Sequence, residues 1–302
     1  MKRRKFLQIS GIFSAYALSG SLQTMLHASK TSLIRNYLSK DPSRILDLHS
    51  SLSYKILSTK GSLMSDGNRV PGKADGMAAF SVDSNHTVIV RNHELGRTSG
   101  KLMGPFTDPK KNALALGKNH YDPTAFGGTT NILINDNTNE VVREYLSLSG
   151  TMTNCAGGPS PWNTWLTCEE NTSINKKENI FHGYVFEVDP KKNYLQEPVP
   201  LKNMGRFSHE AVAFDRYGSA YLTEDRSDGL LYKFIPDQKN SLAEGKLYAL
   251  KVKYQDSRNW NKENILSGEE FSIEWVRLDD PDPVDDTLRE TGYEKGATIF
   301  AR

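Results

Sequence analysis

The sequence has little net charge, little cysteine and no long apolar run. Its formal net charge is +2, from 38 lysines and arginines against 36 aspartates and glutamates. This balance, with no basic stripe interleaved with aromatic residues, argues against nucleic-acid binding. A helix that spans a bilayer needs about 20 apolar residues, and the apolar run near the N-terminus is shorter and diluted by serine and glycine. No stable membrane anchor is therefore expected.

Residues 1–29 are predicted to be an export signal. Basic residues open the chain after Met1, and a moderately apolar run follows from 9 to 22. Arg3 and Arg4 precede x-Phe-Leu, which matches the twin-arginine signal, whereas a chance basic start before a buried helix is the alternative. The twin-arginine machinery exports folded proteins, which suits a protein that must fold around a cofactor first. We expect that machinery as a partner and a periplasmic or secreted location.

Both cysteines of the chain lie in residues 151–171, TMTNCAGGPSPWNTWLTCEEN. In an exported protein the default expectation is a disulfide, here between Cys155 and Cys168. One disulfide adds little to so long a chain with a large core, and two adjacent carboxylates follow Cys168. The stretch can therefore be a disulfide-closed hairpin, a metal site or a tight corner of a β-protein.

Past residue 45 the sequence is a series of short β-like runs separated by Gly, Pro, Asn and Asp. Such runs, at spacings of roughly 8 to 20 residues, predict an antiparallel all-β fold. Consecutive hairpins in residues 214–236 favour a β-propeller over a sandwich. Residues 30–44 are predicted to be a helical or irregular lead-in. Residues 253–295 are predicted to be irregular, with 279–286 a solvated or calcium-binding loop. The predicted strands are 87–91, 130–134, 141–145, 164–168, 183–188, 211–214, 219–223 and 230–235.

Acidic residues recur at the ends of these runs, beside His, Asn or Arg rather than among lysines. Acids at strand ends can converge at one end of a propeller channel, where they repel one another unless cations bind. Oxygen ligands suit Ca²⁺, and an added thiolate suits iron or zinc. For any single pair an exposed acid near a turn is the simpler interpretation, but five pairs together favour a metal site. The pairs are Asp75, Asn92-His93-Glu94, Glu169-Glu170, His209-Glu210 and Glu224-Asp225-Arg226.

Several of these stretches resemble the PhoX-type alkaline phosphatases, a family exported by the twin-arginine route. They follow the family order and cover nearly all of residues 30–302, and the segment from NCAGG to TCEEN is the most specific. The resemblance implies that residues 30–302 form a six-bladed β-propeller phosphatase with Fe³⁺ and Ca²⁺ in its channel. The matching stretches are DGMAAF (75–80), RNHE (91–94), GGTTN (127–131), NCAGGPSPWNTWLTCEEN (154–171), HGYVFEVDP (182–190), MGRFSHEAVAF (204–214) and EDR to LYKFIP (224–236).

The same resemblance assigns ligands. Cys155 is similar to an iron ligand of the family, and Glu170 and Glu210 are expected in the same cluster. Side chains alternate along residues 164–170, so Glu170 shares a face with Cys168 while Glu169 points to the other face. A disulfide between the two cysteines stays open as the alternative. The further metal-ligand candidates are Asp75, Asn92, Glu94, Glu169, Glu224 and Asp225.

The activity that the resemblance implies is metal-assisted hydrolysis of phosphate monoesters, which releases inorganic phosphate from small phosphorylated metabolites. Arg226 and Arg302 are the candidates for clamping the phosphoryl oxygens, although a salt bridge to Asp225 or Glu224 is an equal interpretation for Arg226. His93 and His209 are expected to orient ligands rather than to bind metal. The protein is expected to be a monomer.

Two other functions remain open at this stage. A calcium-dependent propeller hydrolase of lactones or organophosphates would need neither iron nor a cysteine ligand. A calcium-stabilised propeller used only for binding would hold its metal structurally and would tolerate changes at Cys155. Metal analysis together with a phosphomonoester assay separates the three.

The C-terminal end leads to a further expectation. The chain stops at Arg302 after an apolar run, and its strand-like runs would supply roughly four or five blades at the usual four strands each. In the family an arginine at this position is followed by glycine and another metal-binding glutamate. We therefore expect the gene product to continue past Arg302 and residues 30–302 alone to be inactive.

Overall fold

The computed structural model describes residues 38–100, 102–106, 115–260 and 266–300, which fall into two compact units, 1–56 and 57–302. The predicted signal at 1–29 and the predicted phosphate ligand Arg302 lie outside the described residues.

In the first unit, β1 (Leu38–Ser39) pairs with β2 (Leu48–His49). The loop between them closes on Asp41, whose carboxylate accepts hydrogen bonds from the Ile45 and Leu46 amides and the Tyr54 hydroxyl. The end of the predicted lead-in is therefore a small hairpin.

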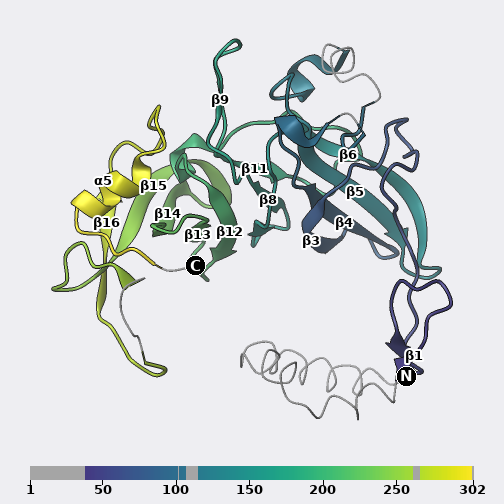
Figure 1. Cartoon of the computed structure of the whole chain (residues 1–302), viewed down its shortest axis with the longest axis horizontal. Helices are drawn as coiled ribbons and strands as arrows, with labels where there is room; N and C mark the ends of the chain where they lie inside the picture. The colour runs from purple at the N-terminus through teal and green to yellow at the C-terminus, as the bar shows by residue number, and fades with distance from the viewer. Residues whose placement is uncertain (1–37, 101, 107–114, 261–265, 301–302) are drawn as a thin grey trace. The chain divides into compact units, whose positions relative to one another are not determined.

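The second unit begins with a four-stranded antiparallel meander (Figure 1). Its strands pair in sequence order, as expected for one propeller blade. Short 3-10 turns at Arg97–Ser99 and Gly117–Asn119 lie between the second and third strands. The strands are β3 (Ala74–Ser81), β4 (His86–His93), β5 (Gly127–Asn135) and β6 (Glu140–Thr151).

A smaller sheet follows, in the order β11-β8-β7. It contains β7 (Gly158–Pro159), β8 (Trp165–Cys168) and β11 (Val185–Val188). Between β8 and β11 the chain forms a separate hairpin of β9 (Ile174–Asn175) and β10 (Ile180–Phe181). A 3-10 turn at Lys202–Met204 leads to the next sheet.

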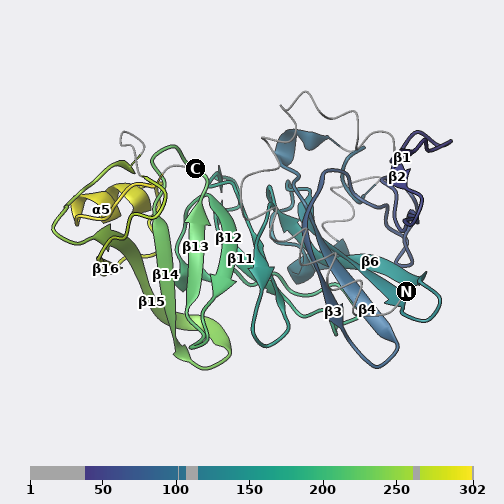
Figure 2. The ribbon, with the colours of Figure 1, turned by 90° about the horizontal axis from the view of Figure 1, so that it is seen from below.

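The third sheet is a five-stranded meander that neighbours the middle sheet (Figure 2). It ends in β16 and the short helix α5 (Leu288–Glu294), so two regular elements lie within 253–295. The prediction that this segment is irregular was therefore wrong. The strands are β12 (His209–Phe214), β13 (Ala220–Glu224), β14 (Leu231–Gln238), β15 (Ser241–Val252) and β16 (Ile273–Leu278).

The middle sheet is buried on both faces, which explains why its strands read as continuous apolar runs rather than as alternating ones. On one face, Trp165 of β8 and Phe186 of β11 pack in a core with Val88 and Val90 of the first meander. On the other face, Leu166 and Cys168 of β8 pack in a core with residues of the third sheet, including Leu222, Tyr232 and Phe234.

Glycines allow the three sheets to meet backbone to backbone beside the predicted site. A Cβ atom at Gly76 of β3 would lie 2.8 Å from the Cα of Ala156, and one at Gly158 of β7 would collide with the carbonyl of Val212 in β12. Gly157 forms a parallel bridge with Ala211. The strands β3, β7 and β12 thus approach one another at the residues that follow Asp75, Cys155 and Glu210.

Every strand predicted from the sequence overlaps a strand of the structure, and the all-β prediction is confirmed. The estimate of four or five blades is not matched, because the described part of the second unit contains three larger sheets. Among the described residues, no helix has the length and apolar character needed to cross a membrane.

Candidate metal centre

Three predicted ligands converge at one point. Ligand atoms of Cys155, Glu170 and Glu210 all lie within 4.8 Å of one another. Cys155 is buried, and the two glutamates are half-buried. A thiol and two carboxylates at this separation can bind a single cation, and the thiol makes a transition metal a better match than calcium alone.

Backbone hydrogen bonds bring these three residues together from different sheets. The Cys155 amide donates to the carbonyl of Cys168 at 3.1 Å, which places Cys155 beside the end of β8. Glu170 then follows β8, and its amide donates to Thr153 at 2.9 Å. The Gly157 amide donates to the carbonyl of Glu210 at 2.8 Å and so joins the cysteine segment to β12. The site is therefore built where the middle and third sheets meet.

The electrostatics of the cluster favour a bound cation. Burial, a hydrogen bond with Asp225 and repulsion from Asp225, Glu210 and Glu94 raise the pKa of Glu170 to about 8. Burial, and then nearby Cys168, Glu210 and Glu170, raise the pKa of the Cys155 thiol. A bound cation would offset this repulsion and favour the ionised form of both groups, so this donor set fits a metal ion.

The two cysteines are free, buried thiols. Sγ of Cys155 lies 3.1 Å from the carbonyl oxygen of His209 and 3.7 Å from that of Cys168. The Cys168 side chain belongs to the core shared with the third sheet. Cys155 belongs to the same core, and the structure contains no disulfide between the two residues.

The Glu169 carboxylate is hydrogen-bonded to protein groups outside the metal cluster. Its carboxylate accepts hydrogen bonds from Nδ1 of His182 at 2.7 Å and from the amides of Met152, Gly183 and Tyr184 at 2.8, 2.9 and 3.3 Å. These four donors occupy the acceptor sites of a carboxylate. We therefore exclude Glu169 from the proposed ligand set, in agreement with the strand alternation that directs it away from Glu170.

Asn92 is also committed to protein contacts. Its buried amide nitrogen donates to the carbonyls of Cys155 and Ala156, and its oxygen accepts from the indole of Trp165 at 2.9 Å. This geometry supports the backbone of Cys155, so we remove Asn92 from the ligand set as well.

Glu94 and Asp75, the other predicted ligands in the first four-stranded sheet, lie outside the cluster of three ligand atoms. Glu94 lies 3.8 Å from Lys73 and is near enough to Glu170 to raise the pKa of that residue. Asp75 is exposed, and its carboxylate accepts from the Gly76 amide. The structure does not bring Asp75 into the cluster of three ligand atoms.

The side chains of Glu224, Asp225 and Arg226 have different partners. Asp225 interacts with Glu170, whereas Glu224 is buried and accepts from the Tyr232 hydroxyl at 2.8 Å. Burial raises the pKa of Glu224 to about 7. The Arg226 guanidinium lies 3.3 Å from Asp286. Arg226 therefore forms a salt bridge with Asp286.

The two histidines of the predicted motifs are neutral structural groups. Burial lowers the pKa of His93 to about 3 and that of His209 to about 3. His93 contacts the carbonyl of Gly72 and the Thr130 hydroxyl, and Nε2 of His209 lies 2.9 Å from the carbonyl of Gly205. Nδ1 of His209 is buried and has no hydrogen-bond partner among the described residues.

The sequence reasoning missed a buried charge network behind the site. His182 lies between Glu169 and Asp122, with its Nε2 3.0 Å from the Asp122 carboxylate. Arg97 pairs with the same carboxylate at 2.6 Å. His182 opens the HGYVF motif, which was the available signal, but its partner Asp122 is 60 residues away and carries no motif of its own.

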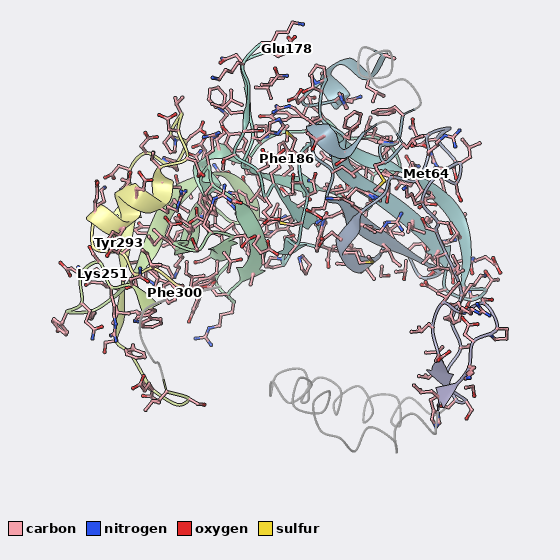
Figure 3. The ribbon with its side chains drawn as sticks, viewed as in Figure 1. Met64, Glu178, Phe186, Lys251, Tyr293 and Phe300 are labelled. Atoms are coloured by element: carbon pink, nitrogen blue, oxygen red, sulfur yellow. The ribbon has the colours of Figure 1, made fainter. Side chains whose placement is uncertain are left out.

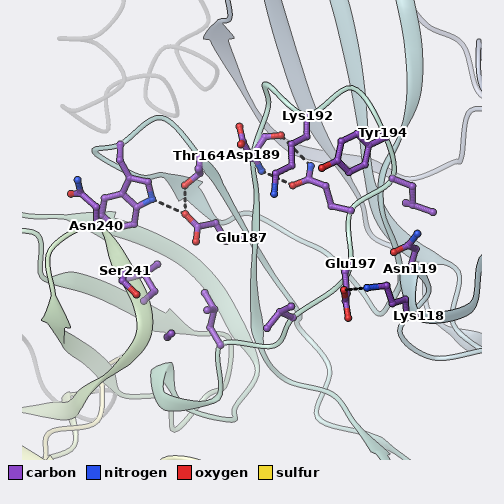
Figure 4. Close-up of a pocket in the computed structure, with 17 residues that line it drawn as sticks. Lys118, Asn119, Thr164, Glu187, Asp189, Lys192, Tyr194, Glu197, Asn240 and Ser241 are labelled. Atoms are coloured by element: carbon purple, nitrogen blue, oxygen red, sulfur yellow. Dashed lines mark hydrogen bonds and ion pairs between the residues drawn. The ribbon is translucent and has the colours of Figure 1, made fainter.

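Two cavities lie near these sheets. One of about 570 Å³ includes Glu210 and Asp225 in its lining. Another of about 740 Å³ is lined by Lys118, Trp162, Glu187 and Tyr194, among others, and Glu187 accepts hydrogen bonds from Trp162 and Thr164 there (Figure 4). None of the predicted site residues lines this second cavity, so it is not part of the metal centre.

Comparisons with known proteins found one family model and a similar solved structure. No curated protein matches the sequence. A solved structure, Pseudomonas fluorescens PhoX in complex with vanadate, a transition state analogue, is similar with a TM-score of 0.52 and 18% sequence identity. The likeness covers 82% of this chain and 60% of that chain, so this sequence spans less than two thirds of that protein.

At this identity the likeness shows the fold, a β-propeller, and the six blades implied by the resemblance remain a prediction. The family model for alkaline phosphatase PhoX matches residues 35–302, which is most of the sequence. The chain belongs to the PhoX alkaline phosphatase family.

Proposed function

We propose that this protein is a metal-dependent phosphomonoesterase that releases inorganic phosphate from small phosphorylated metabolites. One observation carries the proposal: Cys155, Glu170 and Glu210, from two of the stretches that match the family, place their ligand atoms within 4.8 Å of one another. A structural calcium site would not need a thiol, and neither would a calcium-dependent lactonase.

The proposed centre holds iron and calcium. Cys155, Glu170 and Glu210 would bind Fe³⁺, while Asp225 and Glu94 supply oxygen ligands for Ca²⁺. When bound, these ions supply Lewis acidity toward the phosphoryl oxygens. The chain's contribution is a fixed donor geometry, because Asn92 holds the carbonyls of Cys155 and Ala156 and the Gly157 amide is bonded to the carbonyl of Glu210.

Arg226 is the proposed phosphate-binding cation within the described residues. It is half-buried, and its pairing with Asp286 at 3.3 Å orients the guanidinium without enclosing it. A phosphate monoester dianion can accept the remaining donors of this group. Arg302 stays in the proposal from the sequence alone.

We also propose export of the folded protein through the twin-arginine machinery to the periplasm or outside the cell, because a preassembled metal centre is best loaded before export. The proposed exported form is a monomer. Export with a cofactor already bound accounts for a free thiol ligand at Cys155 in an oxidising compartment.

The test is hydrolysis of p-nitrophenyl phosphate by purified full-length protein, compared with its Cys155→Ser variant. We expect turnover by the wild type, loss after treatment with a chelator, and a large decrease for Cys155→Ser. Hydrolysis of a lactone or a phosphotriester, with none of the monoester, would instead favour the lactonase alternative.

A further inference from the structure

The cavity of about 570 Å³ adjoins the proposed metal centre. Glu210, one of the three convergent groups, lines it together with Asp225, which interacts with Glu170. The cavity therefore opens beside the atoms at which a phosphoryl group would be bound. The remaining described lining residues are Thr223, Glu224, Gly229, Leu230, Leu231 and Phe300.

Apart from Thr223 and Gly229, the lining residues that are not acidic are apolar, and they are held by contacts with the protein behind them. Leu230 is buried, and Leu231 and Phe300 are half-buried. The Phe300 amide donates to the carbonyl of Gly229 at 3.0 Å. The Phe300 ring packs against Trp260 with 4.9 Å between ring centroids, and Trp260 packs on Phe271 at the same distance. The apolar lining is thus supported from behind by a cluster of aromatic rings in edge-on and tilted contact.

The charges of this cavity limit what can occupy it. None of its described lining residues is a lysine or an arginine. A second phosphate group would face carboxylates there, and the hydroxyls of a polyol would face Leu231 and Phe300 without partners, which is unfavourable. An alkyl or aryl group would instead gain from burial, by about fourfold in binding for each fully buried methylene.

We infer that this cavity receives the alcohol portion of the substrate, and that the preferred substrates are phosphate monoesters of apolar alcohols. This inference rests on the proposed function. In the reaction, water adds across the ester P–O bond, and the alcohol leaves with the proton from that water. The alcohol oxygen lies at the boundary between the acidic end of the cavity and its apolar wall.

The test compares n-hexyl phosphate with glycerol 1-phosphate on full-length protein. Both release a primary alcohol, and glycerol is the slightly better leaving group, so a preference for the hexyl ester cannot come from intrinsic reactivity. We expect kcat/KM for the hexyl ester to exceed that for the glycerol ester by at least about tenfold.

Substitutions in the cavity lining test whether the preference for the hexyl ester arises in this cavity. Leu231→Thr and Phe300→Asn should each lower the hexyl-to-glycerol ratio of kcat/KM by about three- to tenfold. Phe300→Leu, which keeps an apolar side chain, should retain most of it. Leu63→Thr is the matched control, because Leu63 is 76% exposed and does not line the cavity.

Binding of phosphonates tests the cavity without turnover. Hexylphosphonate should bind more tightly than methylphosphonate by at least about tenfold in calorimetry, with a more negative heat-capacity change. Equal affinities, or equal hydrolysis of the two esters, would overturn the inference and leave the phosphatase proposal standing. Hydrolysis of neither ester would overturn both, and an equal effect of Leu63→Thr would overturn the assignment to this cavity.

Discussion

Nδ1 of His182 lies 2.7 Å from Oε1 of Glu169, and both side chains are fully buried. The other ring nitrogen lies 3.0 Å from Asp122, so one imidazolium joins two carboxylates. Glu169 precedes the proposed ligand Glu170, and its backbone carbonyl also accepts from the His209 amide at 3.0 Å. This network therefore fixes the ends of β8 and β12 from which two ligands project.

Removal of His182 should destabilise the protein strongly. His182→Ala leaves Asp122 and Glu169 without their shared cation, and loss of one partner of a buried pair costs about 3–5 kcal/mol. His86→Ala is the control, because His86 pairs with Asp83 at the surface, where an ion pair contributes below about 1 kcal/mol. Urea unfolding of the three proteins measures the difference, and equal midpoints would contradict the assignment.

The same histidine predicts a pH dependence of stability. Attraction to Glu169 and Asp122 outweighs burial and raises the pKa of His182 to about 9, from an ordinary value of 6.5. The charged form is therefore favoured by folding. Its contribution, on the order of 3 kcal/mol, is fully present below pH 6.5 and is lost as pH rises to about 9.

Thermal unfolding at pH 6 and pH 9.5 tests this sign. Tm of the wild type should fall between the two values by more than Tm of His182→Ala falls. Parallel decreases in the two proteins would show that another group is responsible.

The two cysteines should not be equivalent. Cys155→Ser removes the soft ligand of the proposed centre and should abolish both activity and iron binding, whereas Cys168→Ser should mainly loosen the core in which Cys168 packs. Iron content and p-nitrophenyl phosphate turnover of both variants provide the measurement. Equal losses that added metal does not reverse would favour a disulfide.

Neutral substitutions of the two glutamates separate ligation from other roles. Glu170→Gln and Glu210→Gln keep the side-chain volume but remove a charge and a ligand oxygen, so activity and iron should fall together. Glu178→Gln is the matched control, because Glu178 is exposed at the tip of the β9–β10 hairpin (Figure 3). Iron retained with activity lost would assign Glu170 or Glu210 an acid–base role.

Local apolar runs predicted eight of the strands, although β3 and β15 were missed, and two specific motifs predicted the three residues that converge. The sequence analysis proposed too many ligands. Adjacency in the motifs does not show that Glu169 is bonded to His182, or that Asn92 is bonded to Trp165 and the carbonyl of Cys155. The pairing of His182 with Asp122 depends on a contact across 60 residues, which no local pattern reveals. β16 was missed because its strand carries charges at Glu274 and Arg277.

Elemental analysis of active, full-length protein tests the central claim most directly. The account predicts iron and calcium together in protein that hydrolyses phosphate monoesters, with iron lost from Glu170→Gln in proportion to activity. A preparation that is fully active and free of iron would contradict the assignment of Cys155, Glu170 and Glu210 as the metal centre.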